Sequence, residues 1–286
     1  MYEKLIVPLD GSNKAESILS FVEELALKFN SEITILGVPR EHAPSVPPSL
    51  DKYIDNVNTQ FNNKGLHAKY LLLRGNPGEE IIKYANANND GLLAMANYGG
   101  SGSSHWLLGD LTGKLLLRTV TPLLLAPEKS NEPGKEHSKF KKILIPLDNS
   151  TEGEAALPFA IELAKKTNAR INLLHVIPSI EKTYGMMKYA VNFEKQLFET
   201  LKKEGEDYFQ GIIEKLAGDK LDIKYHFIVG TPAESILSYA EESFTDLIAI
   251  ATHGRTGIKR FVLGSVARQV VLSSDIPVLL VRSKKQ

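Results

Sequence analysis

A glycine-rich segment near the end of the chain carries residue types that suit a bound phosphate. Ala251-Thr-His-Gly254 is followed, after nine residues, by Gly264-Ser265, and a helix is expected over Val266–Leu272. A helix N-terminus offers N–H groups and the positive end of a dipole, which favour an anion. Glycines let backbone approach an oxygen closely. A simpler interpretation stays open, in which the glycines only shape a turn and Ser265 only caps the helix.

Positive charge accompanies this segment. Arg255, Lys259 and Arg260 lie between the two glycines, and Arg268 lies in the following helix. Such a cluster attracts a phosphate-bearing ligand. His253 stands beside it, and we interpret this lone loop histidine as solvated rather than catalytic.

A second copy of the segment occurs earlier in the chain with different chemistry. Ala96-Asn-Tyr-Gly99, nine residues and Gly109-Asp110 keep the length, but an acid stands where the serine is expected. Two like charges about 4 Å apart repel by about 4 kcal/mol at an effective dielectric near 20. The loop 100–108 also has no Lys or Arg, only His105. We therefore expect the first copy to bind an uncharged ligand or nothing.

The sequence lacks the residues and motifs that several other kinds of site require. The chain has no cysteine, which excludes disulfides, thiolate metal ligands and a Cys nucleophile. It has neither the G-x-x-x-x-G-K-[ST] loop of P-loop ATPases nor the G-x-S-x-G elbow of α/β-hydrolases. The seven histidines form no metal-binding spacing. No residue set resembles a general base with an oriented nucleophile, so we expect turnover to be absent or slow.

An internal repeat organises the elements that must position these residues. Lys4-Leu-Ile-Val-Pro-Leu-Asp10 matches Lys142-Ile-Leu-Ile-Pro-Leu-Asp148, at an offset of 146 − 8 = 138. Further along, Gly75-Asn-Pro matches Gly230-Thr-Pro at an offset of 230 − 75 = 155. Two copies in register predict two domains, at 1–128 and 139–286, joined by the polar linker Glu128–Lys139.

Each copy alternates strand-length apolar runs with helical patterns. In the first copy the runs are Leu5–Leu9, Ile33–Val38, Ala68–Leu73, Leu92–Ala96 and Pro122–Leu125. Apolar strands separated by helices indicate a parallel sheet covered on both faces. We predict an α/β fold: two doubly wound, open, parallel five-stranded sheets in tandem, Rossmann-like, each in strand order 3-2-1-4-5. Ligands of such sheets bind beyond the carboxyl ends of the strands.

The second copy carries a net insertion of 155 − 138 = 17 residues, which falls within 178–217. There, Met187, Val191, Leu197, Leu201, Tyr208, Ile212 and Leu216 follow a helical stripe. Seventeen residues would lengthen a helix by roughly 25 Å, so part of the insertion is expected as loop. We interpret it as a longer helix packed on its neighbour; a lid or partner surface beside the ligand site is the alternative.

These features together resemble the universal stress protein family, whose motif reads G-x-x-G, nine residues, G-[ST]. The resemblance spans nearly the whole chain and implies the doubly wound fold. It also implies ATP binding in the second domain, since one branch of the family holds phosphates with this motif, with Mg²⁺ as an accompanying ion. Family resemblance further suggests that the fifth strands, Pro122–Leu125 and Pro277–Val281, pair the domains as an internal pseudo-dimer.

The resemblance assigns roles to individual residues. Pro146 and Asp148 would flank the adenosine, with the Asp148 carboxylate accepting hydrogen bonds, and Val176 would line the adenine pocket. Phosphate oxygens would be held by Gly254, Gly264, Ser265, Val266 and Ala267. Ala251 departs from the family motif, because it replaces the first glycine with a residue whose methyl group narrows the approach.

We therefore expect an ATP-binding regulatory protein of the stress response with an unknown protein partner. The alternatives are a nucleotide-independent interaction or chaperone-like protein, and a weak ATPase or self-phosphorylating enzyme. Lys plus Arg equal Asp plus Glu at 34 each, which speaks against a nucleic-acid or membrane partner. No signal peptide or run of eighteen apolar residues is present, so a cytoplasmic location is expected. A homodimer of whole chains is compatible with the sequence.

Overall fold

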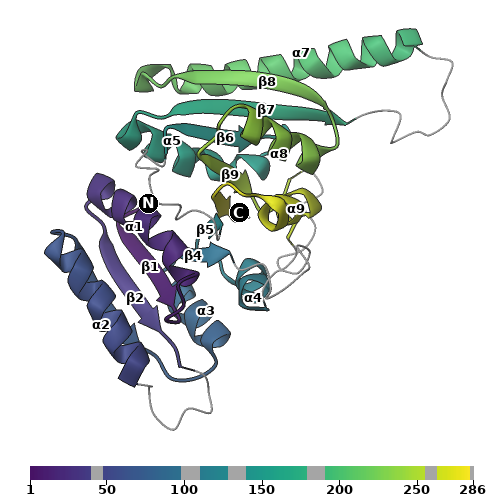
Figure 1. The fold of residues 1–286 in the computed structure, drawn as a ribbon. Helices are drawn as coiled ribbons and strands as arrows, with labels where there is room; N and C mark the ends of the chain where they lie inside the picture. The colour runs from purple at the N-terminus through teal and green to yellow at the C-terminus, as the bar shows by residue number, and fades with distance from the viewer. Residues whose placement is uncertain (40–47, 98–109, 128–139, 179–190, 255–262, 284–286) are drawn as a thin grey trace.

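The computed structural model describes residues 1–39, 48–97, 110–127, 140–178, 191–254 and 263–283 (Figure 1). The first repeat contains β1 (Lys4–Leu9), the 3-10 helix η1 (Ala15–Ile18), α1 (Leu19–Phe29), β2 (Glu32–Gly37), α2 (Pro48–Asn63), β3 (His67–Leu72), α3 (Pro77–Ala87), β4 (Leu92–Asn97), α4 (Asp110–Arg118) and β5 (Leu123–Pro127). The predicted linker Glu128–Lys139 lies outside the described residues.

The second repeat follows the same order. It contains β6 (Lys142–Pro146), the 3-10 helix η3 (Gly153–Ala156), α5 (Leu157–Thr167), β7 (Arg170–Pro178), α7 (Val191–Lys215), the 3-10 helix η4 (Ala217–Asp219), β8 (Ile223–Gly230), α8 (Pro232–Glu242), β9 (Leu247–Ala251), α9 (Ser265–Ser273) and β10 (Val278–Val281). Strand β7, the second strand of this repeat, continues beyond Val176 to Pro178. It pairs in parallel with β8 as far as Pro178 and Gly230.

All ten strands form one sheet, in the order β3-β2-β1-β4-β5-β10-β9-β6-β7-β8. Each repeat thus has the predicted order 3-2-1-4-5 with parallel neighbours, which confirms the fold class. The two halves meet where β10 pairs antiparallel with β5, with Val278 opposite Leu125 and Leu280 opposite Leu123. The expected pairing of the fifth strands is therefore present.

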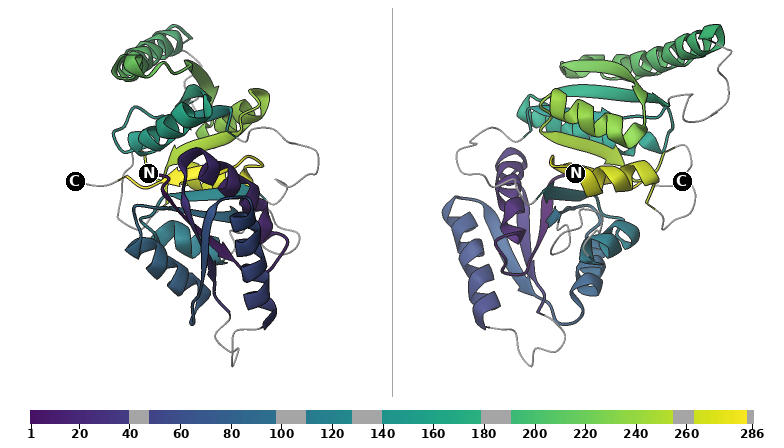
Figure 2. Two further views of the ribbon diagram at one scale, coloured as in Figure 1. Left: turned by 90° about the vertical axis from the view of Figure 1, so that its left-hand side faces the viewer. Right: turned by 45° about the vertical axis from the view of Figure 1, so that its right-hand side comes forward.

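Helices cover both faces of this sheet (Figure 2). On one face, α1, α2, α5 and α7 bury a cluster with residues such as Val22, Phe61 and Phe209. On the other face, α3, α4, α8 and α9 bury a second cluster with residues such as Ile82 and Val270. Each cluster contains residues of both repeats, so the two halves share their cores.

The two repeats have residues in the left-handed backbone conformation at corresponding positions. Helices α1 and α5 end at Asn30 and Asn168, both in the left-handed conformation with φ of 53°. After the first strand of each repeat, Gly11 has φ of 85° and Asn149 has φ of 61°. Glycine and asparagine are the residues that tolerate this region best. The Asp-Gly-Ser and Asp-Asn-Ser turns therefore have one geometry.

Only part of the insertion lengthens a helix. Helix α7 has 25 residues and α2 has 16, a difference of 25 − 16 = 9. Nine residues add about 13 Å at 1.5 Å each. Strand β7 has nine residues where β2 has six, and the 3-10 helix η4 follows α7. Helix α7 packs on β8 through the fully buried Phe209, and a Cβ on Gly205 would meet Phe227 at 2.4 Å. Met187 of the predicted stripe lies outside the described residues.

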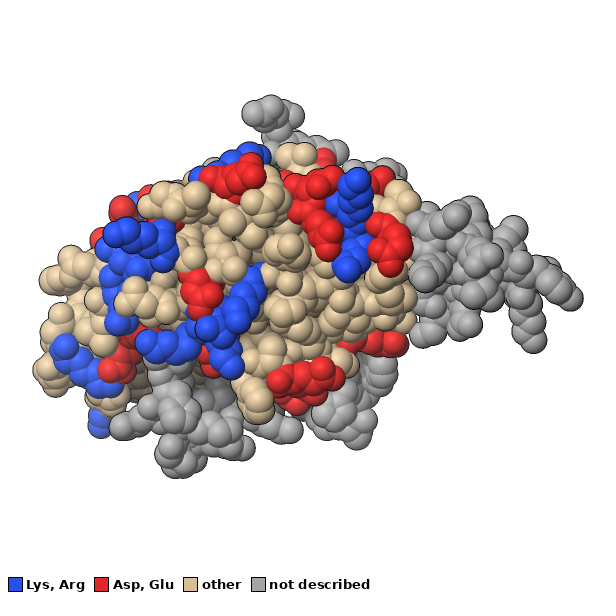
Figure 3. Space-filling model, turned by 90° about the horizontal axis from the view of Figure 1, so that it is seen from above, with Lys and Arg blue, Asp and Glu red and all other residues tan. Residues whose placement is uncertain are grey.

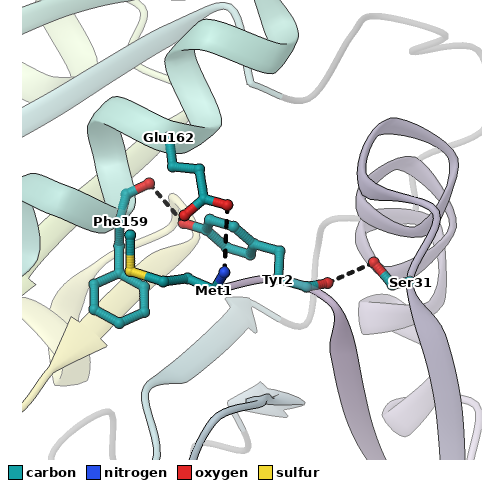
Figure 4. Close-up of polar contacts among 5 residues, drawn as sticks. All are labelled: Met1, Tyr2, Ser31, Phe159 and Glu162. Atoms are coloured by element: carbon teal, nitrogen blue, oxygen red, sulfur yellow. Dashed lines mark hydrogen bonds and ion pairs between the residues drawn. The ribbon is translucent and has the colours of Figure 1, made fainter.

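The N-terminus of the first repeat docks on the second repeat (Figure 4). The Tyr2 hydroxyl donates to the Phe159 carbonyl of α5 at 2.9 Å, and the Ser31 hydroxyl donates to the Tyr2 carbonyl at 2.6 Å. The terminal amine of Met1 pairs with Glu162 at 3.3 Å. Burial, followed by the negative charge of Glu162, raises the pKa of Tyr2 well above its usual range. The phenol therefore stays protonated and donates.

Charge is mixed on the surface. On the face seen from above, Lys and Arg side chains are interspersed with Asp and Glu side chains (Figure 3). No helix among the described residues has the length and apolar character needed to cross a membrane.

Replacing Tyr2 tests the docking of the two repeats. We expect Tyr2→Ala to lower the free energy of unfolding by about 3–5 kcal/mol, because a fully buried aromatic side chain is removed. Tyr2→Phe should cost about 1 kcal/mol, since only the hydrogen bond to Phe159 is lost. Equilibrium urea unfolding measures both. Leu27→Ala is the control, because Leu27 is 62% exposed; an equal effect of Leu27→Ala and Tyr2→Ala would contradict the docking.

Candidate functional site

A cavity of about 360 Å³ opens at the carboxyl ends of β6, β7 and β9, beside the start of α9. We call it the second cavity. Its lining includes all the residues that the sequence assigned to a ligand, namely Pro146, Asp148, Val176, Ala251, Gly254, Gly264, Ser265, Val266 and Ala267. These residues come from four separate elements and their loops, and the folding of one sheet brings them together.

The start of α9 forms one end of the second cavity. The N-cap is Gly264, with φ of −57° and ψ of 147°, so no side chain caps this helix. Ser265 is the first helical residue and is exposed, which excludes the interpretation of Ser265 as the cap itself. The first hydrogen bond of the helix runs from Arg268 N to Gly264 O. N–H groups of the first helical turn have no partner within a helix, and here they face the cavity residues.

Gly264 also holds the loop against the end of β9. Its N–H donates to the Thr252 carbonyl at 2.8 Å, and a Cβ on Gly264 would lie 3.0 Å from that oxygen. A larger residue would push the start of α9 away from the strand. The glycine therefore sets the position of the helix N-terminus.

The Asp148 carboxylate lies at the opposite side, held in a tight turn. Its Oδ1 accepts from the Ser150 backbone N–H at 3.2 Å and from the Ser150 hydroxyl, which in turn accepts from Gly153 N. A Cβ on Gly254 would lie 2.0 Å from Oδ2, and a Cβ on Gly153 would lie 2.5 Å from Oδ1. Two glycines thus leave the space that this carboxylate occupies.

Apolar side chains form the remaining wall. Leu174 and Val176 of β7, Ile236 of α8 and Ile250 of β9 line the cavity together with Pro178 and Pro232. His175 also lines it and is buried, and its Nδ1 donates to the Leu147 carbonyl at 2.8 Å. A lining of apolar side chains with a few polar groups is typical of sites that hold small molecules.

Helix α7 supports the turn that carries Asp148. The Tyr208 hydroxyl donates to Glu154 Oε1 at 2.9 Å, and Glu154 follows Gly153 in η3. Burial, followed by the hydrogen bond to Glu154, raises the pKa of Tyr208 far above its usual range. The inserted helix is therefore tied to the residues beside the cavity.

Of the basic residues predicted beside the site, the structure describes only Arg268. Arg255, Lys259 and Arg260 lie outside the described residues, and Arg268 is exposed on α9. Among the described residues that line the cavity, Asp148 is the one Asp, Glu, Lys or Arg. No group of three or more His, Cys, Asp or Glu in the described part of the chain could hold a metal ion.

Sequence reasoning missed several lining residues. Gly153, Leu174, His175, Pro178, Pro232, Ile236, Ile250, Thr252 and His253 line the cavity but were not assigned to it. The repeat contained a signal for Pro232, since Asn-Pro at 76–77 matches Thr-Pro at 231–232. Gly254, which was expected to approach a phosphate, lines the cavity and lies against the Asp148 carboxylate.

The corresponding glycines of the first repeat, Gly99 and Gly109, lie outside the described residues. The backbone of α4 begins at Asp110, as α9 begins at Ser265. The substitution of acid for serine therefore falls at the first residue of the helix.

Comparison with known proteins matches both repeats. The model of the universal stress protein family matches residues 1–127 and 139–282. Universal stress protein MJ0531 of Methanocaldococcus jannaschii is 33% identical over 149 residues, covering 51% of this chain and 85% of that protein. Universal stress protein YxiE of Bacillus subtilis is 32% identical over 147 residues, covering 50% of this chain and 99% of that protein. Each relative thus aligns with about half of this chain.

A solved structure has the same fold over the full length. A universal stress protein from Archaeoglobus fulgidus superposes with a TM-score of 0.69 at 20% identity, covering 99% of both chains. The tandem arrangement is thus found in another protein.

The contact between Gly254 and Asp148 predicts a coupling that can be measured. Gly254→Ala should lower the free energy of unfolding by about 1–3 kcal/mol, because its Cβ overlaps the Asp148 carboxylate. In an Asp148→Ala background the same change should cost under about 0.5 kcal/mol, since the overlapping oxygens are gone. Urea unfolding of the four proteins gives the cycle. Equal costs in the two backgrounds would show that the two residues do not meet.

Proposed function

Because the chain belongs to the universal stress protein family, we propose that its second repeat binds ATP as a regulatory ligand. The observation that carries the proposal is the convergence of the nine assigned residues on one cavity. Pro146, Val176 and Ser265 are far apart in the sequence. They line the same space because the fold brings the ends of β6 and β7 close to the start of α9.

The phosphates would lie at the start of α9. Backbone N–H groups of Ser265, Val266 and Ala267 are those of the first turn, and the helix dipole adds positive potential there. The Ser265 hydroxyl is exposed and can donate to a phosphate oxygen. A Cβ on Gly264 would fill the space beside the Thr252 carbonyl, so the cradle needs glycine at this position.

The adenosine would occupy the other end. Val176, Ile236 and Ile250 offer apolar surface to a purine ring. Asp148 accepts hydrogen bonds, and its second oxygen has lone pairs suited to ribose hydroxyls or an amino group. The volume of about 360 Å³ lies within the range of about 300–1,000 Å³ usual for small-molecule pockets.

Magnesium would arrive with the nucleotide rather than in a protein cage. Mg²⁺ keeps several waters and is held by substrate phosphates with one or two carboxylates. In the part of the cavity lining that the structure describes, Asp148 is the only carboxylate, which fits an ion carried by the phosphates.

We propose regulation rather than turnover. Among the described lining residues, His175 Nδ1 donates to Leu147 O, and His253 Nδ1 lies 2.9 Å from Thr252 Oγ1. Thr252 is buried, at 5% exposed, so its hydroxyl is poorly placed to attack a ligand. Nucleotide occupancy would shift a conformation or surface read by a protein partner in a stress response. The alternatives, a nucleotide-independent interaction protein and a weak ATPase, are outcomes of the test below.

Calorimetric titration of nucleotide-stripped protein with Mg-ATP tests the proposal. We expect one site per chain. Ser265→Asp should weaken binding at least a hundredfold, because a carboxylate about 4 Å from a phosphate repels it by about 4 kcal/mol. Asp110→Ser is the matched control at the first residue of α4, and it should leave the affinity in the second repeat unchanged.

Three outcomes would change the assignment. No heat at millimolar ATP would favour the nucleotide-independent protein. Unchanged affinity in Ser265→Asp would move the phosphates away from α9. Phosphate release that disappears in Ser265→Asp would establish a slow ATPase, whereas release that persists in that variant would come from a contaminant.

A further inference from the structure

The first repeat has a cavity of its own, of about 220 Å³, at the carboxyl ends of β1, β2 and β4. We call it the first cavity. It is smaller than the second cavity and lies below the range of about 300–1,000 Å³ that holds drug-sized ligands. The first cavity therefore encloses less of a ligand than the second cavity does.

The lining of the first cavity repeats part of the second. All eleven of its lining residues correspond, at the repeat offsets of 138 and 155, to residues that line the second cavity. Eight of the eleven are the same residue type, among them Pro8, Asp10, Val38, Ile81 and Ala96. Their counterparts form the apolar wall and the carboxylate of the second cavity, which is the end assigned to adenosine.

The two cavities differ at the phosphate end. Helix α4 begins with Asp110, an acid, where α9 begins with Ser265. Ala15 stands where Gly153 leaves room for the Asp148 carboxylate, and Asp10 is exposed. Among the described residues that line the first cavity there is no Lys or Arg, and the charged group is the Asp10 carboxylate. An anionic ligand of this cavity would therefore meet the negative charge of Asp10.

The remaining polar group is suited to a neutral hydrogen-bond donor. Oδ1 of Asp10 accepts from the Ser12 backbone N–H at 3.0 Å and from the Ser12 hydroxyl at 2.7 Å. These bonds orient the carboxylate, and an ionised carboxylate has about four acceptor positions in total. Its remaining capacity can accept from hydroxyl or amino groups of a ligand beside Val38 and Ile81.

We propose that the first cavity binds an uncharged nucleoside, one that carries a base and a ribose but no phosphate. The choice of a nucleoside rests on the proposed function. The first cavity shares its lining with the part of the second cavity that we assign to adenosine. The base lies against the apolar wall, and Asp10 accepts hydrogen bonds from the nucleoside. One chain then has two sites that differ in their tolerance of phosphate.

Adenosine is the probe, added by calorimetric titration to the full chain saturated with Mg-ATP. We expect one adenosine per chain under these conditions. Asp10→Ala should weaken its binding at least tenfold, because a charge-assisted hydrogen bond is lost. Val38→Trp, which fills the apolar wall and keeps the Asp10 turn, should do the same. Neither change should alter ATP affinity. AMP should bind the first cavity at least tenfold more weakly than adenosine.

The matched variant Asp148→Ala separates this inference from the proposed function. Titrated without ATP, it should still bind one adenosine with the affinity measured for the first cavity, even if ATP were to bind nowhere in the chain. The inference is overturned if the ATP-saturated protein takes up no adenosine at millimolar concentration. It is also overturned if Asp148→Ala abolishes adenosine binding while Asp10→Ala retains it, or if AMP binds as tightly as adenosine.

Discussion

The antiparallel pairing of β5 with β10 is the contact on which the arrangement of the molecule depends. Leu123–Leu125 and Val278–Leu280 are buried apolar segments that would each form an open sheet edge in an isolated repeat. Open edges present unpaired N–H and C=O groups to solvent and to other chains. Once the two edges pair, each core continues from one repeat into the other, and further contacts form across the junction.

These further contacts join the two halves at backbone groups that helices leave unpaired. The Asn97 amide donates to the Val271 carbonyl near the end of α9, and Arg282 donates to the carbonyls of Leu116 and Leu117 near the end of α4. The last carbonyls of a helix have no partner within it. Each repeat thus supplies hydrogen-bond donors to a helix of the other.

Sequence reasoning predicted the strand order and the edge of the sheet at which the second cavity opens, since both follow from repeat register and from the rules of parallel sheets. The apolar runs located β1 and β4 to within one residue. What it could not predict depends on distances between residues far apart in the chain. The place of Gly254 against Asp148, the burial of Tyr2 on α5 and the lining position of His175 have no local sequence signature. The sequence also indicated a longer second helix in the second repeat, but the length of α7 depends on packing against β8.

The antiparallel pairing of β5 and β10 determines where the two cavities open relative to each other. In each repeat the cavity lies at the carboxyl ends of its strands, and strand direction reverses between β5 and β10. The two mouths therefore lie at opposite margins of one continuous sheet. Coverage of one mouth by another molecule therefore leaves the other mouth open, and a molecule that covers both must span the sheet.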